Sequence, residues 1–377
     1  MSLEIDKDLY HKLDKQYYSG PENFKLCSRK FNNTKKTWTK YPYVNTNINY
    51  KKISIIEYNI FGALKYDRKP YDVNRRLKIL PDELKKYNAD FIILHEVSKK
   101  ILTKLLKIDW IRKSYYISEC DTERVNVLYG IGTVILSKIP FLDFKTYVVP
   151  GYDMYSLSLG IFLINNRKYA ICGSQYHSSK GYSTFRKAQF HATLNILLDM
   201  KENHGVNDFI WASDFNYDIN RPEKWSEAIY MNQLLKRYNL GNVWNDAWVN
   251  KYPNKPGYTE DTEVNEMRKY MKGNLKRIKA GIKKFNLSTI KAENKQVRFD
   301  AILYNGKTLK VHDIEVIGTQ GKVVTGYKVW PSDHFGLFAT LSLTNQTKKS
   351  KKKNLKKPKK SLENLRENLN QFYIKMF

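Results

Sequence analysis

The stretch from Trp330 to Leu337 places Asp333 next to His334, directly before the apolar run 338–341. Side chains alternate along an extended chain, so this aspartate and histidine cannot both point into a core. A carboxylate and an imidazole at a strand end could hold a metal ion and stabilise charge on a phosphoryl group during its transfer. Taken alone, the pair is better explained as a surface turn, because Ser-Asp-His sequences arise by chance in many proteins.

Four further apolar runs also end or break at a polar residue. The runs are 53–59, which leads to Asn59; 89–97, which leads to Glu96; 209–216, which carries Asp214 and Asn216; and 297–304, which carries Asp300. Asp214 and Asn216 are two positions apart and therefore lie on one face of an extended chain. Asp300 stands inside its predicted strand, where an unpaired carboxylate is costly. One polar strand end is ordinary capping, but five such places are hard to explain as capping alone.

In chain order, these residues resemble the active-site series of the endonuclease/exonuclease/phosphatase superfamily of metal-dependent phosphoesterases. The resemblance runs from about residue 53 to residue 343 and implies an α/β fold, a four-layer α/β sandwich of two packed mixed sheets flanked by helices. Within the superfamily, four segments resemble type 2 tyrosyl-DNA phosphodiesterases. They are 331–337, 297–300, 178–181 with the following Arg186 and Gln189, and 257–262, which is similar to the Tyr-Thr-Trp-Asp-Thr segment of those enzymes.

The resemblance implies a hard divalent cation, Mg²⁺ with Mn²⁺ as the alternative, held by Glu96 and oriented by Asp333. A carboxylate at the end of a buried strand gains from a cation, and Mg²⁺ is typically bound by one or two carboxylates. Asp214 is implied to position or deprotonate the attacking water.

The same resemblance implies that Asn59 and Asn216 hold the phosphate and the nucleophile. His334 is implied to donate to a non-bridging phosphate oxygen. Its implied partner is Asp300, which selects the tautomer of the imidazole and keeps it cationic.

Two positions depart from the family pattern. Gln175 stands where the family has a histidine, and Glu260 stands where those phosphodiesterases carry a tryptophan suited to base stacking. On an extended strand His177 shares a face with Gln175, so we expect it to supply the missing imidazole, with an exposed turn residue as the alternative. The residues expected to contact substrate are Gln175, Ser178, Arg186 and Tyr258. For Arg186, a structural role is the alternative.

The charge of the chain favours a polyanionic partner. Its 377 residues include 66 Lys and Arg against 37 Asp and Glu, a formal net charge of +29. Each phosphate that a protein neutralises releases counterions, so such an excess suits nucleic acid. A lysine run at 348–360 carries part of this charge and is either a solvated, disordered run or an arm for nuclear import or nucleic acid.

Three widely spaced cysteines, Cys27, Cys120 and Cys172, predict neither a disulfide framework nor a zinc site. They favour a reducing, intracellular compartment, nuclear or cytoplasmic. The sequence contains no run of about 18 apolar residues, so no membrane span is predicted. We expect a monomer.

The chain divides into an N-terminal extension (1–50), a catalytic domain (51–345) and a basic tail with a short amphipathic helix (346–377). The extension lacks a core of its own and is expected to pack on the domain through Trp38, Tyr41 and Tyr43. Apolar spacing predicts helices over 74–87, 186–200 and 268–285. The residues 165–167 predict a hairpin turn between two strands.

Three functions are compatible with this pattern. The first is a phosphodiesterase that acts at DNA ends or on tyrosyl-DNA adducts, in DNA repair. The second is a general nuclease or a phosphatase acting on RNA, nucleotide or phosphoinositide. The third is a non-catalytic protein that binds nucleic acid with the same fold, against which the metal and His-Asp positions argue.

Overall fold

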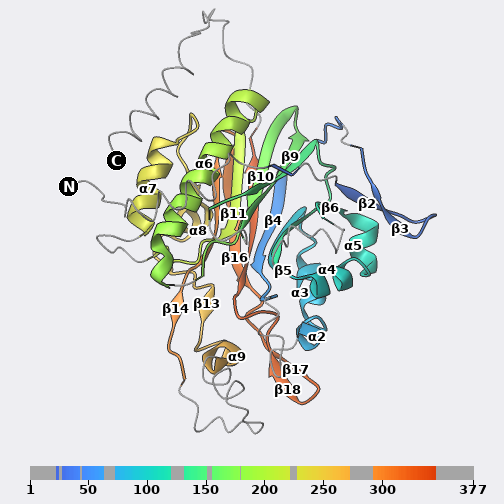
Figure 1. The fold of residues 1–377 in the computed structure, drawn as a ribbon, viewed down its shortest axis with the longest axis vertical. Coiled ribbons are helices and arrows are strands. Elements are labelled where there is room, and N and C mark those ends of the chain that lie inside the picture. The colour runs from blue at the N-terminus through green and yellow to red at the C-terminus, as the bar shows by residue number, and fades with distance from the viewer. Residues whose placement is uncertain are drawn as a thin grey trace, which may run out of the picture.

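The computed structural model is an α/β sandwich of two mixed sheets that pack face to face, with helices on both outer faces (Figure 1). This confirms the predicted four-layer fold. The described residues are 23–24, 28–42, 45–62, 73–119, 131–150, 155–178, 180–220, 227–271 and 292–344. The basic tail, Tyr43 and most of the predicted helix over 268–285 lie outside them.

The first sheet has seven strands. In spatial order they are β1 (Asn23–Phe24), β8 (Asp143–Val148), β9 (Ser156–Ile164), β10 (Arg167–Gly173), β11 (Asp208–Asp214), β15 (Asp300–Asn305) and β12 (Asn245–Asp246). Only β10 and β11 are parallel neighbours. Helices α6 (Ser183–His204) and α7 (Glu227–Arg237) cover the outer face, where Leu194, Leu197 and Trp211 are fully buried in one cluster.

The second sheet has eight strands. In spatial order they are β16 (Leu309–Ile317), β19 (Gly336–Leu343), β4 (Lys52–Asn59), β5 (Phe91–Val97), β7 (Gly132–Ser137), β6 (Tyr116–Ile117), β2 (Arg29–Asn32) and β3 (Thr37–Lys40). Strands β4 and β5 are parallel. Helices α3 (Leu80–Tyr87), α4 (Lys99–Leu105) and α5 (Asp109–Ser114) pack on its outer face.

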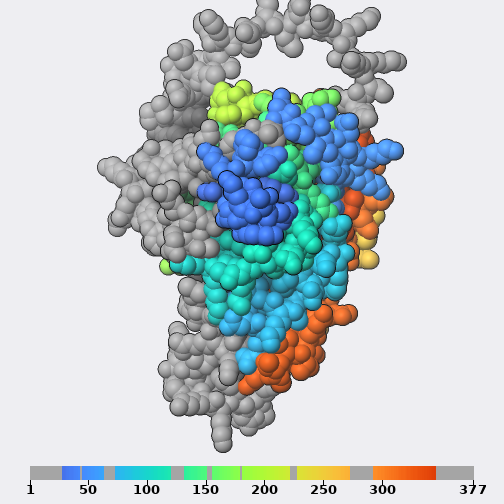
Figure 2. Space-filling model, turned by 90° about the vertical axis from the view of Figure 1, so that its right-hand side faces the viewer, coloured from blue at the N-terminus to red at the C-terminus, as the bar shows by residue number. Residues whose placement is uncertain are grey.

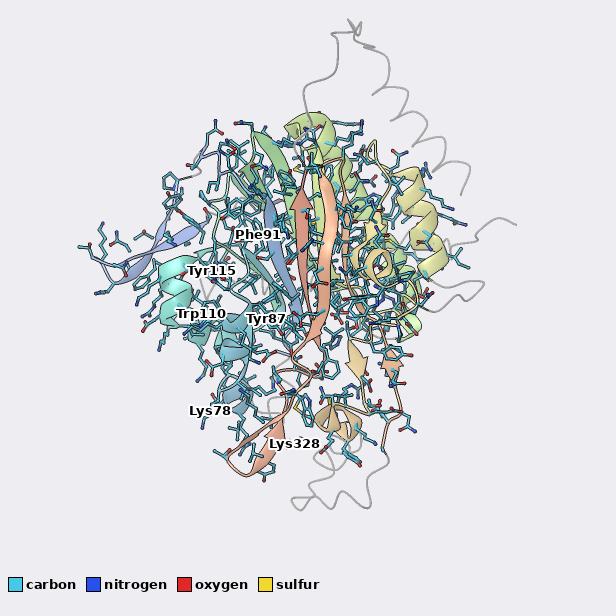
Figure 3. The ribbon with its side chains drawn as sticks, turned by 180° about the vertical axis from the view of Figure 1, so that it is seen from behind. Lys78, Tyr87, Phe91, Trp110, Tyr115 and Lys328 are labelled. Atoms are coloured by element: carbon cyan, nitrogen blue, oxygen red, sulfur yellow. The ribbon has the colours of Figure 1, made fainter. Side chains whose placement is uncertain are left out.

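The core between the sheets is built from alternate residues of the central strands. Ile55, Phe91, Ile171 and Ile210 are all completely buried there. Phe91, labelled in Figure 3, packs edge-to-face on Phe162 with ring centroids 4.8 Å apart. Burial of each such side chain contributes about 1.5–3 kcal/mol, so this layer holds the two sheets, and the residues at their ends, in a fixed relation.

Two local predictions meet different outcomes. The hairpin is confirmed: Asn165 and Asn166 join β9 to β10 with φ of +52° and +58°, as a type I′ turn requires. The continuous helix over 74–87 is wrong, because the structure has α2 (Val73–Arg76), a turn, and then α3. Pro81 lies in the first turn of α3, where its missing N–H is tolerated, but the same residue cannot continue a helix from α2.

Part of the N-terminal segment adds strands to the edge of a sheet. Strands β2 and β3 form a hairpin that extends the eight-stranded sheet through β6, and Figure 2 shows this hairpin lying over the face formed by α4 and α5. Trp38 donates through Nε1 to the Leu106 carbonyl at 3.1 Å, and the rings of Tyr41 and Tyr116 make an edge contact at 4.8 Å. The expected packing through Trp38 and Tyr41 is therefore observed.

Short elements gather at one end of the sandwich. They include the hairpin of β17 (Lys322–Val324) and β18 (Tyr327–Val329), the pair β13 (Glu260–Asp261) and β14 (Gln296–Val297), and α9 (Glu266–Lys269) (Figure 1). Lys78, in the turn between α2 and α3, and Lys328, on β18, mark this end in Figure 3. In the part of the chain that the structure describes, no helix is long and apolar enough to cross a membrane.

Candidate active site

The polar residues predicted at strand ends meet at one edge of the sandwich. Asn59 ends β4, Glu96 lies near the end of β5, and Asp214 ends β11. Asp300 begins β15 and stands directly opposite Asp214 in the antiparallel register, at the strand's first residue and not inside it as predicted. The segment before β19 brings His334 to the same place, so both sheets contribute to the site.

The backbone at Glu96 is shaped to turn its carboxylate into the site. Its φ is +56°, and the pairing of β5 with β7 shifts register between Leu94 and Val97. A bulge of this kind redirects a side chain near the end of a strand. Gly62 makes room for this backbone, because a Cβ there would lie 1.7 Å from the Glu96 carbonyl oxygen. Any other residue at position 62 would displace Glu96 or the loop after β4.

Amide groups hold the carboxylates in place. Asn59 Nδ2 donates to Asp214 Oδ2 at 2.9 Å and to Glu96 Oε1 at 3.2 Å, which ties the two sheets together. The Asn216 side chain donates to Asp214 Oδ2 at 2.8 Å, and its backbone N–H donates to Asp214 Oδ1 at 2.9 Å. Asp214 is fully buried, so these bonds fix the direction of its carboxylate.

His334 and Asp300 form a buried ion pair. The Nδ1 atom of His334 lies 2.9 Å from Asp300 Oδ2, and both side chains are almost completely buried. Burial alone would lower the pKa of His334, but the carboxylates of Asp300 and Asp214 outweigh it and raise this pKa well above the ordinary value. The imidazole is therefore a cation at neutral pH, with Nδ1–H on Asp300.

The carboxylates repel one another where they meet. Burial raises the pKa of Glu96, and the charge of Asp333 raises it further. Burial and then Asp300 raise the pKa of Asp214 well above its ordinary value. A cation placed among these groups would offset the repulsion, and their oxygen atoms are the ligands that hard divalent ions prefer.

Two groups of residues could take such a cation. Asp214, Asp300 and His334 each offer a ligand atom, all within 4.8 Å of one another. However, the Nδ1 atom of His334 carries the proton shared with Asp300, so it is not open to a metal. The Glu96 carboxylate, with the charge of Asp333 beside it, is the better fit for the predicted ligand.

The segment that carries Asp333 is fastened beside Asn59. Ser332 Oγ donates to the Asn59 carbonyl at 2.6 Å, and Asn265 Nδ2 donates to the Ser332 carbonyl at 3.0 Å. Asp333 itself is half-buried. The predicted Ser-Asp-His motif is thus part of the site, and its serine holds the loop in position.

Gln175, and not His177, reaches the carboxylates. Its Nε2 donates to Glu96 Oε1 at 2.5 Å. The ring of His177 stacks on Tyr182 at 4.0 Å and packs near Tyr155. The shared face predicted for Gln175 and His177 does not hold, because β10 ends at Gly173 and strand alternation stops there. The expected replacement of the missing imidazole by His177 is not what the structure shows.

The other residues predicted to contact substrate are placed differently. Arg186 is buried and donates to Glu227 Oε1 and to the His177 carbonyl. Arg186 therefore has the structural role that was the alternative to substrate contact. Ser178 is exposed in the turn after β10, and Tyr258 is half-buried just before β13.

The position of Glu260 is explained by salt bridges. Its carboxylate is almost completely buried and lies 3.0 Å from Arg268 and 2.9 Å from Lys295. A charged network therefore occupies the place where the resembling enzymes carry a tryptophan. This network begins close to the site, because the charge of Asp333 also acts on Arg268.

Three supporting residues were not predicted. The hydroxyl of Thr259 accepts the backbone N–H of Asp300 at 3.1 Å and so fixes the start of β15. The buried guanidinium of Arg76 donates to the Pro331 carbonyl at 3.2 Å and to two carbonyls in the loop after β4. Nothing in the basic segment around Arg76 distinguishes it. Glu57 could have been found from the sequence, because it places a carboxylate inside the apolar run 53–59.

Known proteins match the chain at the level of family and fold. The model of the Endonuclease/Exonuclease/phosphatase family matches residues 56–334. The TDP2 of D. rerio, solved in complex with a single-strand DNA product, is 21% identical with a TM-score of 0.55, covering 77% of this chain and 99% of that one. The human Nocturnin catalytic domain with bound sulfate is 14% identical with a TM-score of 0.50, covering 78% and 95%.

A mannosyl-6-phosphatase from Bacteroides thetaiotaomicron is 13% identical with a TM-score of 0.53, covering 77% of this chain and 100% of that one. None of the curated proteins matches the sequence significantly. At these identities the solved structures establish the fold, and their differing names leave the substrate open.

Proposed function

The chain belongs to the endonuclease/exonuclease/phosphatase family, and from this we propose that it is a Mg²⁺-dependent phosphodiesterase that hydrolyses nucleic acid, at DNA ends or tyrosyl-DNA adducts. One observation carries the chemistry. The cationic imidazole of His334, paired with Asp300, faces the carboxylates of Glu96 and Asp214 at the edge where both sheets end. Phosphoester hydrolysis needs both a cationic donor for the phosphate oxygens and a carboxylate for the water.

Each side chain of the site then has a role in the hydrolysis. Glu96, with Asp333 beside it, would hold the ion, which supplies positive charge to the phosphate when bound. Asp214 accepts the proton of the attacking water, because Asn59 and Asn216 hold its carboxylate in one direction. The imidazole of His334 donates a hydrogen bond to a phosphate oxygen.

The nucleic-acid partner is supported by charge. The net charge of +29 favours a polyanion, and D. rerio TDP2 was solved with a DNA product. We propose an intracellular location, nuclear or cytoplasmic, and a monomeric protein on the sequence grounds given above.

A second candidate is a nuclease or phosphatase acting on RNA, nucleotide or phosphoinositide. The salt-bridged Glu260 favours it, because a charged network cannot stack on a base as an aromatic ring does. The non-catalytic alternative gains no support from the site, where the predicted carboxylates and the His-Asp pair stand together.

A substrate panel separates these candidates. Tyrosyl-DNA, abasic duplex DNA, single-stranded RNA and inositol phosphates are each assayed with Mg²⁺ and again with excess chelator. We expect hydrolysis of a DNA substrate that chelation abolishes. Glu96→Ala and Asp214→Asn should each lower turnover at least about a hundredfold while the protein stays folded. Full activity in excess EDTA would refute the metal requirement, and preference for inositol phosphates would favour the second candidate.

The basic tail is tested by deletion of residues 346–377. Phosphate contacts add affinity without sequence preference and weaken with salt. We expect binding of a DNA substrate to weaken and its salt dependence to become shallower, with turnover retained. An unchanged affinity and salt dependence would exclude a nucleic-acid role for the tail.

A further inference from the structure

A carboxylic side chain without an assigned task lies directly behind the site. Glu57 stands in β4 opposite Ile93 on β5 and Leu337 on β19, and its side chain is completely buried. It lies on the face of β4 that carries Ile53 and Ile55 into the core between the sheets. A buried carboxyl group in an apolar layer is costly unless it is paired.

Among the described residues, the basic groups that act on Glu57 are His95 and His334. The Nε2 atom of His95 lies 3.3 Å from Glu57 Oε1. Burial lowers the pKa of His95 to about 3, so its ring is neutral. The Nδ1 atom of that ring is already engaged by Thr133 Oγ1, at 3.0 Å. The cation of His334 is committed to Asp300.

The Glu57 carboxyl lies close enough to the Asp300 carboxyl for a proton to be shared between them, and this contact is one of the causes that raise the pKa of Glu57. Both oxygens of Glu57 and the Oδ1 atom of Asp300 are buried. If both carboxyl groups were ionised, none of these three oxygens would accept a hydrogen bond. Two carboxylates in contact cannot both remain charged in such a place, so one of them keeps a proton. Asp300 has the cationic partner, and burial followed by the charges of Asp300 and Asp214 raises the pKa of Glu57 well above its ordinary value. Glu57 is therefore the acid and Asp300 the carboxylate.

We propose that Glu57 is a positioning residue, which as a neutral acid donates a hydrogen bond to Asp300 Oδ1 and so holds the His334 ring in its working orientation. One oxygen of Asp300 then accepts from Glu57 and the other from His334, so the carboxylate cannot rotate. The inference rests on the proposed function for its kinetic readout, and deepens it by extending the site into the layer between the sheets.

Two substitutions separate a donor from mere filling of space. In Glu57→Gln the amide N–H can replace the acid proton, whereas Glu57→Leu fills the volume and donates nothing. We expect kcat of Glu57→Gln to stay within about threefold of the parent. For Glu57→Leu we expect kcat to fall about 10–100-fold with KM little changed. Losses of this size are usual when a residue that hydrogen-bonds to an active-site group is removed. Ser54→Ala, which removes a hydrogen bond to Asp90 at the other end of β4, is the matched control and should retain full kcat.

Infrared spectroscopy of the full-length protein at neutral pH reads the acid without any substrate. We expect the parent-minus-variant difference spectra to show a protonated-carboxyl band for both Glu57 variants and none for Ser54→Ala. This readout decides the inference even if no substrate in the panel is hydrolysed, an outcome that would refute only the proposed function. The inference is overturned by absence of the band from the Glu57 difference spectra, by equal loss of kcat in the Gln and Leu variants, or by parent-like kcat in Glu57→Leu.

Discussion

Two histidines beside the same strand ends have opposite surroundings. His334 lies against buried carboxylates, and its pKa is raised well above the ordinary value. His177 lies among the rings of Tyr155, Tyr182 and Phe185, and burial together with the Arg186 charge lowers its pKa to about 4. One ring is a cation at neutral pH and the other is neutral. The difference shows that the surroundings of an imidazole, and not its place after a strand, decide whether it can act on a phosphate.

The largest expected effect comes from the carboxylate-bound histidine. His334→Gln should lower kcat at pH 7 by about 10²–10⁴-fold, because a positioned proton donor typically contributes that much. Steady-state kinetics on the best panel substrate measures it, with thermal denaturation to show that the variant folds. His191→Gln is the control, since the His191 imidazole, unlike that of His334, is neutral and is bonded to Tyr238 away from the site. Equal losses in the two variants would contradict a catalytic role for His334.

The second prediction concerns what keeps His334 charged. Asp300→Asn removes the main carboxylate that raises the pKa of His334, so this pKa falls towards the value that burial favours. Because a raised pKa keeps the cation until pH exceeds it, the parent should hold its activity as pH rises through neutrality. The variant should lose activity between about pH 6 and pH 8, near the ordinary histidine pKa. The measurement is kcat/KM against pH, and parallel profiles would show that Asp300 does not set the charge.

The His334–Asp300 pair also predicts how the free energy of unfolding changes with pH. A histidine with a raised pKa in the folded state stabilises the fold fully below its unfolded pKa of about 6.5, and this contribution is lost as pH rises through the folded value. The parent's advantage over Asp300→Asn in urea denaturation should therefore be largest in acid and shrink at alkaline pH. An advantage that grows with pH would be the wrong sign for this ion pair.

The strand-end residues of the site could be predicted because each interrupts an apolar run. Asn59, Glu96, Asp214 and Asp300 were all located this way. The parallel pair of β4 and β5 brings the first two together, and the antiparallel register of β11 and β15 sets Asp214 opposite Asp300. Such a position constrains a side chain through the backbone alone. The four-layer fold was implied by the family resemblance that these residues carry.

The direction of His177 could not be predicted, because it depends on rings from other segments. Tyr155 precedes β9, and Tyr182 lies at the start of α6, so their approach is tertiary information. The buried role of Arg76 was hidden for the same reason: its acceptors are carbonyl groups, which every residue has.

A smaller effect is expected at the residue that replaces the family histidine. Gln175 donates to Glu96 and thereby lowers the pKa of that carboxyl against the effect of burial. Gln175→Ala should raise this pKa further and weaken the apparent affinity for Mg²⁺ about tenfold, with a lesser change in kcat at saturating metal. A Mg²⁺ titration of activity tests this, with Ser54→Ala, at the far end of β4, as control. Unchanged Mg²⁺ dependence would mean that Gln175 does not tune Glu96.

The smallest effect on activity is expected at His177, where the ring matters and the charge does not. His177→Phe keeps an aromatic ring against Tyr182 and Phe185, so kcat should stay within about threefold of the parent and stability at pH 7 within about 1 kcal/mol, the scale of one aromatic pair. His177→Ala loses those contacts and should be less stable, but equally active per folded molecule.

Acid distinguishes the His177 variants further. The folded parent keeps His177 neutral down to about pH 4, whereas the unfolded chain protonates it below about pH 6.5. Because the unfolded state binds more protons in that window, the parent loses stability as pH falls from about 6.5 to 4. Phenylalanine cannot bind a proton, so His177→Phe should gain on the parent in urea denaturation at pH 5 compared with pH 7. If instead His177→Phe abolished turnover while folding normally, His177 would be a catalytic imidazole after all, and the contrast between the two histidines would fail.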